Sequence, residues 1–313
     1  MIDTLDLILR QYEYPEVSFL EEVPQYLTTV ISDGINYETN SRKVVGLYKN
    51  YTITITSKRI CINKGSLCKY VHGDNVAHIL SREDIKNAIN DLSLVLNLPI
   101  NKASVCRVDI GANIQVDNPI ATYLNRFSKY KYTQPSTMKH GINFKATNIE
   151  LAFYDKNKEA NTEQQYPYLL RYEIRIHNPK KVFKKLLLAE DLYNPQIYDK
   201  LVYTWLNCFC HIKLKPTNNH SPTYNDVKDL TALKNYCFDR IIAEYYEEII
   251  SQIEIARSKN ILSSRNYFNI QDRISKASQI IAPDYIDPII ELKEKVKQIA
   301  YNNLSERTPY LLK

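Results

Sequence analysis

Apolar and polar residues alternate strictly in the first part of the chain. Residues 51–56 read Tyr-Thr-Ile-Thr-Ile-Thr, and further apolar segments occur at residues 2–9, 44–48 and 60–63. Alternation with a period of two puts one set of side chains on each face of a strand, so that one face can be buried and the other left polar. This pattern predicts an antiparallel meander of strands in the N-terminal part.

Helical patterns follow the meander and dominate the end of the chain. Ser81 and Asp84 have the spacing of a capping box, and apolar residues recur after them at helical intervals. Beyond about residue 178 the pattern is helical almost throughout, with long amphipathic helices predicted over about 226–259 and 288–303. Helix starts are also indicated by Asn-Pro at 118–119, 178–179 and 194–195 and by Asp-Pro at 287–288.

Three further strand patterns lie between residues 104 and 177, and each carries polar residues at alternate positions. The segments 105–114, 148–156 and 170–177 have one apolar set that must face the core. If these segments pair in one sheet, their polar sets meet on its other face. That face would gather Arg107, Asp109, Glu150, Tyr154, Lys156, Arg171, Glu173 and Arg175.

This set of polar side chains suits chemistry on a phosphodiester. Carboxylates held close together repel unless a cation lies between them, and oxygen ligands of this kind suit Mg²⁺ or Mn²⁺. A tyrosine can attack phosphorus while the metal polarises the phosphate and arginines hold its oxygens. The alternative is a solvent-exposed sheet face with cross-strand arginine–carboxylate pairs and no chemistry.

Composition narrows the class of protein. The chain has 313 residues, 44% of them hydrophobic and 24% charged, which predicts a globular protein of about two domains. No stretch approaches the ~18 consecutive apolar residues of a membrane span. Six cysteines are too few for a disulfide framework and favour a reducing cytoplasm. With only 6 glycines and no Gly-rich phosphate motif, a nucleotide-binding loop is excluded.

The net charge of +6 is concentrated in the middle third of the chain. Residues 101–200 hold 16 basic and 10 acidic residues, and no acid lies between Asp117 and Glu150. Aromatic residues in that interval alternate with Arg126, Lys129, Lys131, Lys139 and Lys145. Such a stretch fits a polyphosphate partner whose bases can stack, so we predict that it binds DNA. A solvated basic loop is the alternative.

Three short motifs occur in a fixed order. They are Cys-Arg-Val-Asp at 106–109, Ala-Phe-Tyr-Asp-Lys-Asn-Lys-Glu at 152–159 and Leu-Arg-Tyr-Glu-Ile-Arg-Ile at 170–176. Together they resemble the motifs of replication initiators of the filamentous-phage gene II type and, more loosely, those of rolling-circle initiators of staphylococcal-type plasmids. The opening Met-Ile-Asp-Thr-Leu is also similar to the phage type. The resemblance covers about residues 1–190.

The resemblance implies a sequence-specific nickase for rolling-circle replication. Such an enzyme cuts one strand of the origin, joins the 5′ phosphate to a tyrosine and leaves a 3′ hydroxyl that primes synthesis. A second transesterification then closes the displaced circle. By motif position Tyr154 is the nucleophile. Tyr166, Tyr168 and Tyr172 are its rivals, and Tyr172 is expected to point into the core.

The same match of motifs implies the remaining roles. Asp109 and Glu173 are the expected ligands of Mg²⁺ or Mn²⁺, and the third ligand is left open among Glu150, Asp155 and Glu159. The sequence has no His-x-His cluster, so the metal site has to be carboxylate-based. Phosphate contacts are expected from Arg107, Lys156, Arg171 and Arg175, together with the five basic residues of the 126–145 stretch.

We therefore predict an α+β chain in which an antiparallel sheet carries the nicking site and a mostly helical C-terminal region follows. The catalytic domain is predicted at 1–215 and the helical region at 223–313. The expected partners are single- and double-stranded origin DNA and the host helicase and polymerase, in the cytoplasm of a bacterial host and away from membranes. The competing function is a non-catalytic nucleic-acid-binding regulator of a phage or plasmid.

Overall fold

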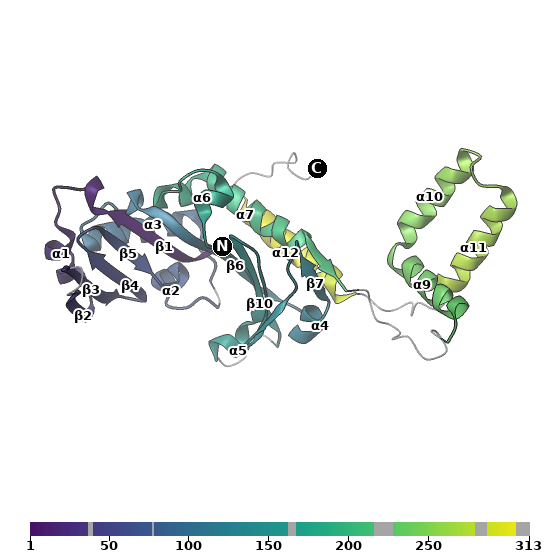
Figure 1. Cartoon of the computed structure of the whole chain (residues 1–313), viewed down its shortest axis with the longest axis horizontal. Coiled ribbons are helices and arrows are strands. Elements are labelled where there is room, and N and C mark those ends of the chain that lie inside the picture. The colour runs from purple at the N-terminus through teal and green to yellow at the C-terminus, as the bar shows by residue number, and fades with distance from the viewer. Residues whose placement is uncertain (37–39, 77, 162–166, 216–227, 279–286, 305–313) are drawn as a thin grey trace. The chain divides into compact units, whose positions relative to one another are not determined.

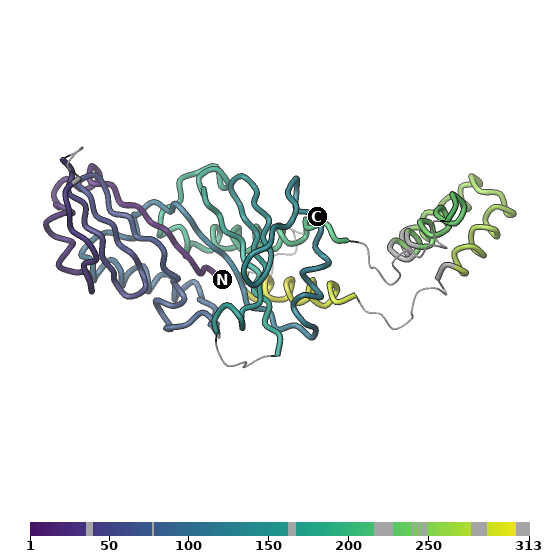
Figure 2. Tube along the Cα trace, turned by 60° about the horizontal axis from the view of Figure 1, so that its bottom comes forward, coloured from purple at the N-terminus to yellow at the C-terminus, as the bar shows by residue number. Residues whose placement is uncertain are grey.

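The computed structural model describes residues 1–36, 40–76, 78–161, 167–215, 228–278 and 287–304 (Figures 1 and 2). Contacts divide the chain into two compact units. The first comprises Met1–Leu214 with Pro288–Lys313, and the second comprises Lys215–Asp287. In the ranges described, no helix is long and apolar enough to cross a membrane.

A ten-stranded antiparallel sheet forms the centre of the first unit (Figure 1). Its order is β2-β3-β4-β5-β1-β6-β11-β10-β9-β8, so the first strand lies between β5 and β6. The strands are β1 Ile2–Arg10, β2 Thr29–Asn36, β3 Ser41–Tyr48, β4 Tyr51–Thr56, β5 Arg59–Asn63, β6 Ser104–Gln115, β8 Ser136–Met138, β9 Gly141–Lys145, β10 Ile149–Asp155 and β11 Leu169–Ile176. A separate sheet pairs β7 (Phe127–Tyr130) with β12 (Ile212–Leu214).

The helices of the first unit begin where the sequence places helix signals. Ser81 caps α3 (Arg82–Leu96) by accepting the Asp84 N–H at 3.1 Å, and Asp84 accepts the Ser81 N–H at 2.8 Å. This confirms the predicted capping box. Asn194 caps α7 (Pro195–Cys210) by accepting N–H groups of its first turn. The other α-helices described in this unit are α1 Phe19–Glu22, α2 Leu67–His72, α4 Ile120–Leu124, α5 Lys156–Ala160, α6 Pro179–Phe183 and α12 Pro288–Asn303.

The apolar faces of the strands and helices share one core. On β11, Tyr172 is fully buried, its ring stacks on Phe153 at 4.5 Å, and its hydroxyl donates to the Trp205 carbonyl of α7 at 2.9 Å. Helix α12 packs beside α7 (Figure 1). Because the apolar alternates of β6, β10 and β11 face these helices, their polar alternates lie on the opposite face. The predicted α+β class and the alternation are confirmed.

The basic stretch is not one loop, as it contains β7, β8 and β9. These short strands are held by a few buried aromatic side chains, among them Phe127, Tyr130 and Phe144. The sequence did not predict them, because strands of three to five residues carry too few alternating positions to stand out from a polar background.

The second unit is a small group of helices around Ile242, Ile253 and Ile274. The prediction of one helix over about 226–259 is wrong, because the chain leaves helical geometry at Tyr245 with φ −126° and ψ 33°. A continuous helix would hold Ile242 and Ile253 about 16 Å apart at 1.5 Å per residue. The break lets both pack into the same core. The helices are α9 Leu230–Glu244, α10 Tyr246–Ser258 and α11 Ser264–Ser278.

Helix α12 returns to the first unit. Its Glu291 accepts the Tyr123 hydroxyl at 2.5 Å and the Asp117 N–H at 3.1 Å, and its Lys295 pairs with Asp117 at 3.1 Å. The sequence placed this helix in a separate C-terminal region at 223–313, since an amphipathic pattern does not say which partner covers its apolar side. The predicted boundary loop at 216–222 lies outside the described residues.

Candidate active site

Three neighbouring strands bring the polar motif residues onto one face of the sheet. Strand β11 pairs with β6 so that Arg175 lies opposite Asp109 and Arg171 lies opposite Asn113. Strand β10 pairs with β11 so that Tyr154 also lies opposite Arg171. Directly opposed residues of antiparallel strands share a face, so these side chains meet across the strands.

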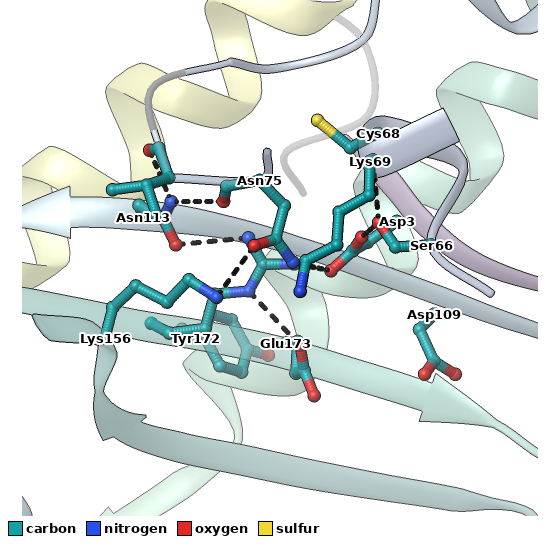
Figure 3. A network of polar contacts seen from close by, with 12 residues as sticks. Asp3, Ser66, Cys68, Lys69, Asn75, Asp109, Asn113, Lys156, Tyr172 and Glu173 are labelled. Atoms are coloured by element: carbon teal, nitrogen blue, oxygen red, sulfur yellow. Dashed lines mark hydrogen bonds and ion pairs between the residues drawn. The ribbon is translucent and has the colours of Figure 1, made fainter. Parts of the chain in front are cut away.

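Arg171 is the centre of a polar network whose other members Asp3, Asn113 and Glu173 are labelled in Figure 3. Its side chain is buried and donates to Asp3 Oδ2 at 2.5 Å, to Glu173 Oε2 at 3.2 Å and to Asn113 Oδ1 at 3.1 Å. Asp3 comes from β1, so the network ties the first strand to β6 and β11. The two carboxylates neutralise the positive charge of the buried guanidinium, and this removes most of the free-energy cost of burying it.

Tyr154 and Arg175 meet at the carboxylate of Glu173. The Tyr154 hydroxyl donates to Glu173 Oε2 at 3.3 Å, while Arg175 donates to Glu173 Oε1 at 2.8 Å through Nε and at 2.7 Å through Nη2. Burial and the charge of Glu173 raise the pKa of the Tyr154 phenol. The phenol is therefore protonated at neutral pH and holds its proton against a carboxylate that can accept it.

Asp109 and Arg107 form a two-pronged ion pair on β6. Arg107 donates to the two carboxylate oxygens of Asp109 at 2.8 and 2.6 Å. Burial raises the pKa of Asp109 to about 6, although Arg107 acts in the opposite direction. Asp109 is thus close to its titration point under mildly acidic conditions.

This raised pKa predicts a measurable pH dependence of stability. The folded protein binds a proton at Asp109 more tightly than the unfolded chain does, so this stabilisation is present at low pH and is lost as pH rises through about 6. Between pH 4.5 and pH 7 the free energy of unfolding is expected to lose about 2 kcal/mol from this group. Urea unfolding of the wild type and of Asp109→Asn at both pH values measures the difference. Equal pH dependence in the two proteins would contradict the assignment.

Glu150 lies on β10, next to the strand β11 that carries Glu173. It accepts Arg175 Nη1 at 3.0 Å and the Asn143 amide at 2.8 Å, and it lies 3.5 Å from His177. Burial acts to raise its pKa, but the Asn143 hydrogen bond and the nearby Arg175 charge outweigh burial and lower it. Glu150 is therefore an ionised, fully engaged carboxylate.

Lys156 and Glu159 pair with each other rather than with the other motif residues. Both belong to α5, and Lys156 Nζ lies 2.6 Å from Glu159 Oε2. Lys156 is only 1% exposed and also donates to Asn75 Oδ1 at 3.0 Å (Figure 3). Asp155 caps the same helix by accepting the Lys158 N–H. Lys156 is thus a buried side chain that stabilises the loop carrying Asn75.

The carboxylates that are predicted to bind a metal ion are already neutralised by arginines. Asp109 is bonded to Arg107, and Glu173 is bonded to Arg171 and Arg175. Within the described ranges, no group of three His, Cys, Asp or Glu side chains is arranged to hold a metal ion. As arranged, these residues do not fit Mg²⁺ or Mn²⁺, and the chemistry below is derived without a cation.

Two parts of the network were missed from the sequence. Asp3 gave only a weak signal, as part of the opening pentapeptide that is similar to the phage type. Asn113 is a polar alternate of the predicted 105–114 strand but was not placed in the site, and Asn75 gave no signal. The Asn113 amide donates to the Asn75 carbonyl at 2.9 Å. Of the rival tyrosines, Tyr172 points into the core as expected and Tyr166 lies outside the described residues.

The basic stretch presents exposed lysines on short strands and turns. Lys129 on β7 lies directly opposite Lys213 on β12, and both are exposed. Like charges opposed across a ribbon repel, so an anion between them would stabilise it. Lys213 was not among the predicted DNA contacts. Arg175, which was, is engaged with carboxylates. The exposed lysines of the stretch itself are Lys129, Lys131, Lys139 and Lys145, and Arg126 is half-buried.

Comparison with known proteins gives the class of the chain and then its family. The family model for the N-terminal part of the phage replication-associated protein, the gene II product, matches residues 1–214, which makes the chain a replication protein. It belongs to this gene II replication-associated family, and the predicted type is confirmed. The chain is also similar to a rolling circle replication initiator protein from Geobacillus stearothermophilus, with 14% identity, a TM-score of 0.39 and coverage of 77% of this chain and 95% of that chain. Comparison with curated proteins gives no match.

Proposed function

We propose that the chain is an origin-specific DNA nickase and strand-joining enzyme for rolling-circle replication, with Tyr154 as its nucleophile. The observation that carries the proposal is the 3.3 Å hydrogen bond between the Tyr154 phenol and Glu173, on a face that also bears Arg171 and Arg175. Attack on a phosphodiester needs a nucleophile, a base that accepts its proton and cations that bind the phosphate oxygens. The phenol, the carboxylate and the two guanidinium groups can fill these roles. Membership of a replication family supports an origin as the substrate.

In the proposed reaction the Tyr154 oxygen attacks the scissile phosphorus. The new O–P bond forms as the P–O3′ bond breaks, and the phenol proton passes to Glu173. The 3′ oxygen leaves as a hydroxyl after taking a proton from a water molecule, and the protonated Glu173 returns its proton to the hydroxide that remains. Because the pKa of Tyr154 is raised, the nucleophile stays neutral until the phosphate arrives, and Glu173 then acts as its base. Attack by a 3′ hydroxyl on the phosphotyrosine reverses the step and joins the strand.

The two guanidinium groups keep donors for the phosphate. An arginine has five N–H donors. Arg171 uses three nitrogens to bind Asp3, Glu173 and Asn113, each with one N–H. The N–H groups that remain can bind non-bridging oxygens without breaking these pairs. The carboxylates therefore hold the guanidinium groups in place before the DNA binds.

Supercoiled DNA that carries the origin tests the proposal. The wild type is expected to convert it to nicked circles with protein on the 5′ end. Mass spectrometry of the trapped nucleotidyl peptide should place the nucleotide on Tyr154. A nucleotide on Tyr168, or on any other tyrosine, would reject the assignment. Tight origin binding without any covalent product would instead favour the non-catalytic regulator.

Mg²⁺ or Mn²⁺ stays a predicted cofactor that these residues, as arranged, do not accommodate. A cation at Asp109 would have to displace the guanidinium of Arg107. Arg107→Ala frees this carboxylate, so calorimetry should detect tighter Mn²⁺ binding than in the wild type. The double variant Arg107→Ala/Asp109→Asn should lose the gain. Equal Mn²⁺ binding in all three proteins would exclude Asp109 as a ligand.

The basic stretch supplies the proposed hold on the DNA backbone. Neutralising Lys129, Lys131 and Lys139 together is expected to weaken binding to every sequence. The slope of log K against log salt should become less steep by about 0.9 for each phosphate that the protein no longer neutralises. Adding Lys213→Ala should reduce the slope further, because this lysine lies opposite Lys129. A slope unchanged by all four substitutions would place these lysines outside the interface.

A further inference from the structure

The face that carries Tyr154 continues across β6 into the N-terminal half of the sheet. Asp6 on β1 lies opposite Arg107 on β6, and opposed residues share a face. Further along β1, Ile8 lies opposite Cys61 of β5, and Cys61 lies opposite Thr54 of β4. The same register reaches β3 through Val45. The polar face of the active site and this half-sheet are therefore one continuous surface.

This half-sheet has one buried face and one face that reaches solvent. Ile53, Ile55, Ile60 and Ile62 are buried on the core side. Their alternates are half-exposed or exposed, which is the pattern of a sheet with no layer packed on that side. The solvent-facing alternates on these strands, here called the open half-sheet, are Asp6, Ile8, Arg10, Lys43, Val45, Leu47, Thr52, Thr54, Thr56, Arg59, Cys61 and Asn63.

The charged groups on this open half-sheet are mainly basic, although residues 1–100 carry 10 basic and 12 acidic residues. Among its residues named above, Asp6 is the one acid, and it is half-buried. Other acids belong to the helices that pack on the core side, among them Glu21 and Glu22 of α1 and Glu83, Asp84 and Asp91 of α3. In the N-terminal half of the sheet, basic groups thus predominate on the open face, and many of the acids lie on the side covered by helices.

Two observations point to an anionic ligand on the open half-sheet. Arg10 and Arg59 lie directly opposite each other on β1 and β5. Such a like-charge pair is unfavourable unless an anion lies near it. Arg10 has Glu13 at 3.9 Å, whereas Arg59 and Lys43 pair with no carboxylate in the described ranges. Thr56 of β4 lies opposite Lys43, and its hydroxyl donates to the Arg59 carbonyl at 3.0 Å. Thr54, the next residue of β4 on the same face, has a hydroxyl that can donate to a phosphate oxygen.

The residue types favour duplex DNA over a single strand. Single-strand surfaces combine basic residues with aromatic side chains on which bases stack. The twelve residues of the open half-sheet include no aromatic, because Tyr51 is buried on the core side. Basic and hydroxyl groups without a stacking platform are suited to the phosphates of a duplex.

We propose that the open half-sheet is a second DNA-contact surface, which holds duplex DNA to one side of the nick through Arg59, Lys43 and Thr54. The inference rests on the proposed nicking function for the position of the nick. Strand β4 lies five strands from β10 in the sheet order, or about 24 Å at ~4.8 Å per strand. That distance spans about seven base pairs of a duplex at ~3.4 Å each.

The test compares Lys43→Ala/Arg59→Ala with a control that removes two charges from the helical side, Lys86→Ala/Lys293→Ala. Fluorescence anisotropy with an origin duplex of about 20 base pairs should give an affinity at least ~10-fold lower for the first variant and unchanged for the control. The salt slope should become less steep by about two units. Binding of the matching single strand should not change. Hydroxyl-radical footprinting should lose protection over about seven base pairs on one side of the nick.

A second variant, Thr54→Glu, places a carboxylate at the centre of the face and should weaken duplex binding without changing the melting temperature. Duplex affinity and salt slope unchanged in both variants would overturn the inference, as would an equal loss for duplex and single strand. If the variants lose duplex affinity while the wild type forms no phosphotyrosine, the nickase proposal fails and the DNA surface stands. If cleavage of a short single-stranded origin fragment persists with unchanged duplex binding, only the surface is rejected.

Discussion

Tyr154→Phe is expected to abolish covalent attachment to origin DNA and to lower nicking by ~10⁴-fold or more, because the attacking atom is removed. Origin binding should stay within a few fold, since the phenol contributes one hydrogen bond at most. Glu173 keeps its bonds to Arg171 and Arg175 in this variant, so the fold should be preserved. Nicking assays on supercoiled origin DNA and anisotropy on the same sequence measure the two effects.

Tyr168→Phe is the matched control for this substitution. Tyr168 lies just before β11 and is half-buried against the core, so it is a tyrosine of the same region in a different environment. The variant should nick at the wild-type rate. Loss of nicking in Tyr168→Phe with full activity in Tyr154→Phe would transfer the role of nucleophile to Tyr168.

The second large effect is expected for Arg171→Ala. This change leaves Asp3 and Glu173 buried without their shared partner, and breaking a buried ion pair on one side costs about 3–5 kcal/mol. Urea unfolding should therefore show a large loss of stability, and nicking should disappear with it. Arg171→Lys keeps the charge but cannot reproduce three directed bonds, so its stability should be intermediate.

A companion substitution separates stability from chemistry. The double variant Arg171→Ala/Asp3→Asn removes one of the stranded charges and should regain part of the lost stability, while nicking remains absent. If Arg171→Ala unfolds at the same urea concentration as the wild type, the network does not support the fold. If it also nicks normally, Arg171 takes no part in the reaction.

The sheet could be predicted because burial imposes a period of two on its strands. The motif residues around Asp109, Tyr154 and Glu173 were placed on one face by their apolar neighbours alone, and the structure has them there. The alternation of apolar and polar residues does not show which residue pairs with each charged side chain. Arg171 is bonded to Asp3, which lies 168 residues away in the chain. Such pairs depend on how the strands are ordered, and no local pattern reports that order.

The same limit explains the errors in the helical part. Helical periodicity continues across Tyr245, because the apolar residues on either side of the break fit one stripe. The packing of Ile253 against Ile242 and Ile274 decides that the chain must turn there. Lys213 was missed for a similar reason, since its position opposite Lys129 arises from the pairing of β7 with β12, two strands that are far apart in the sequence.

The return of α12 to the first unit has a consequence for dividing the chain experimentally. The family match ends at residue 214, but the folded unit that contains it does not. A fragment cut at 214 would lack Ile289, Leu292 and Val296, which are buried in the core, and would leave apolar surface on α7 and β6 open to water. The first unit is thus discontinuous in the gene, with the second unit encoded as an insertion within it. Its minimal folding length includes a segment that begins only at Pro288, well after the matched family region has ended.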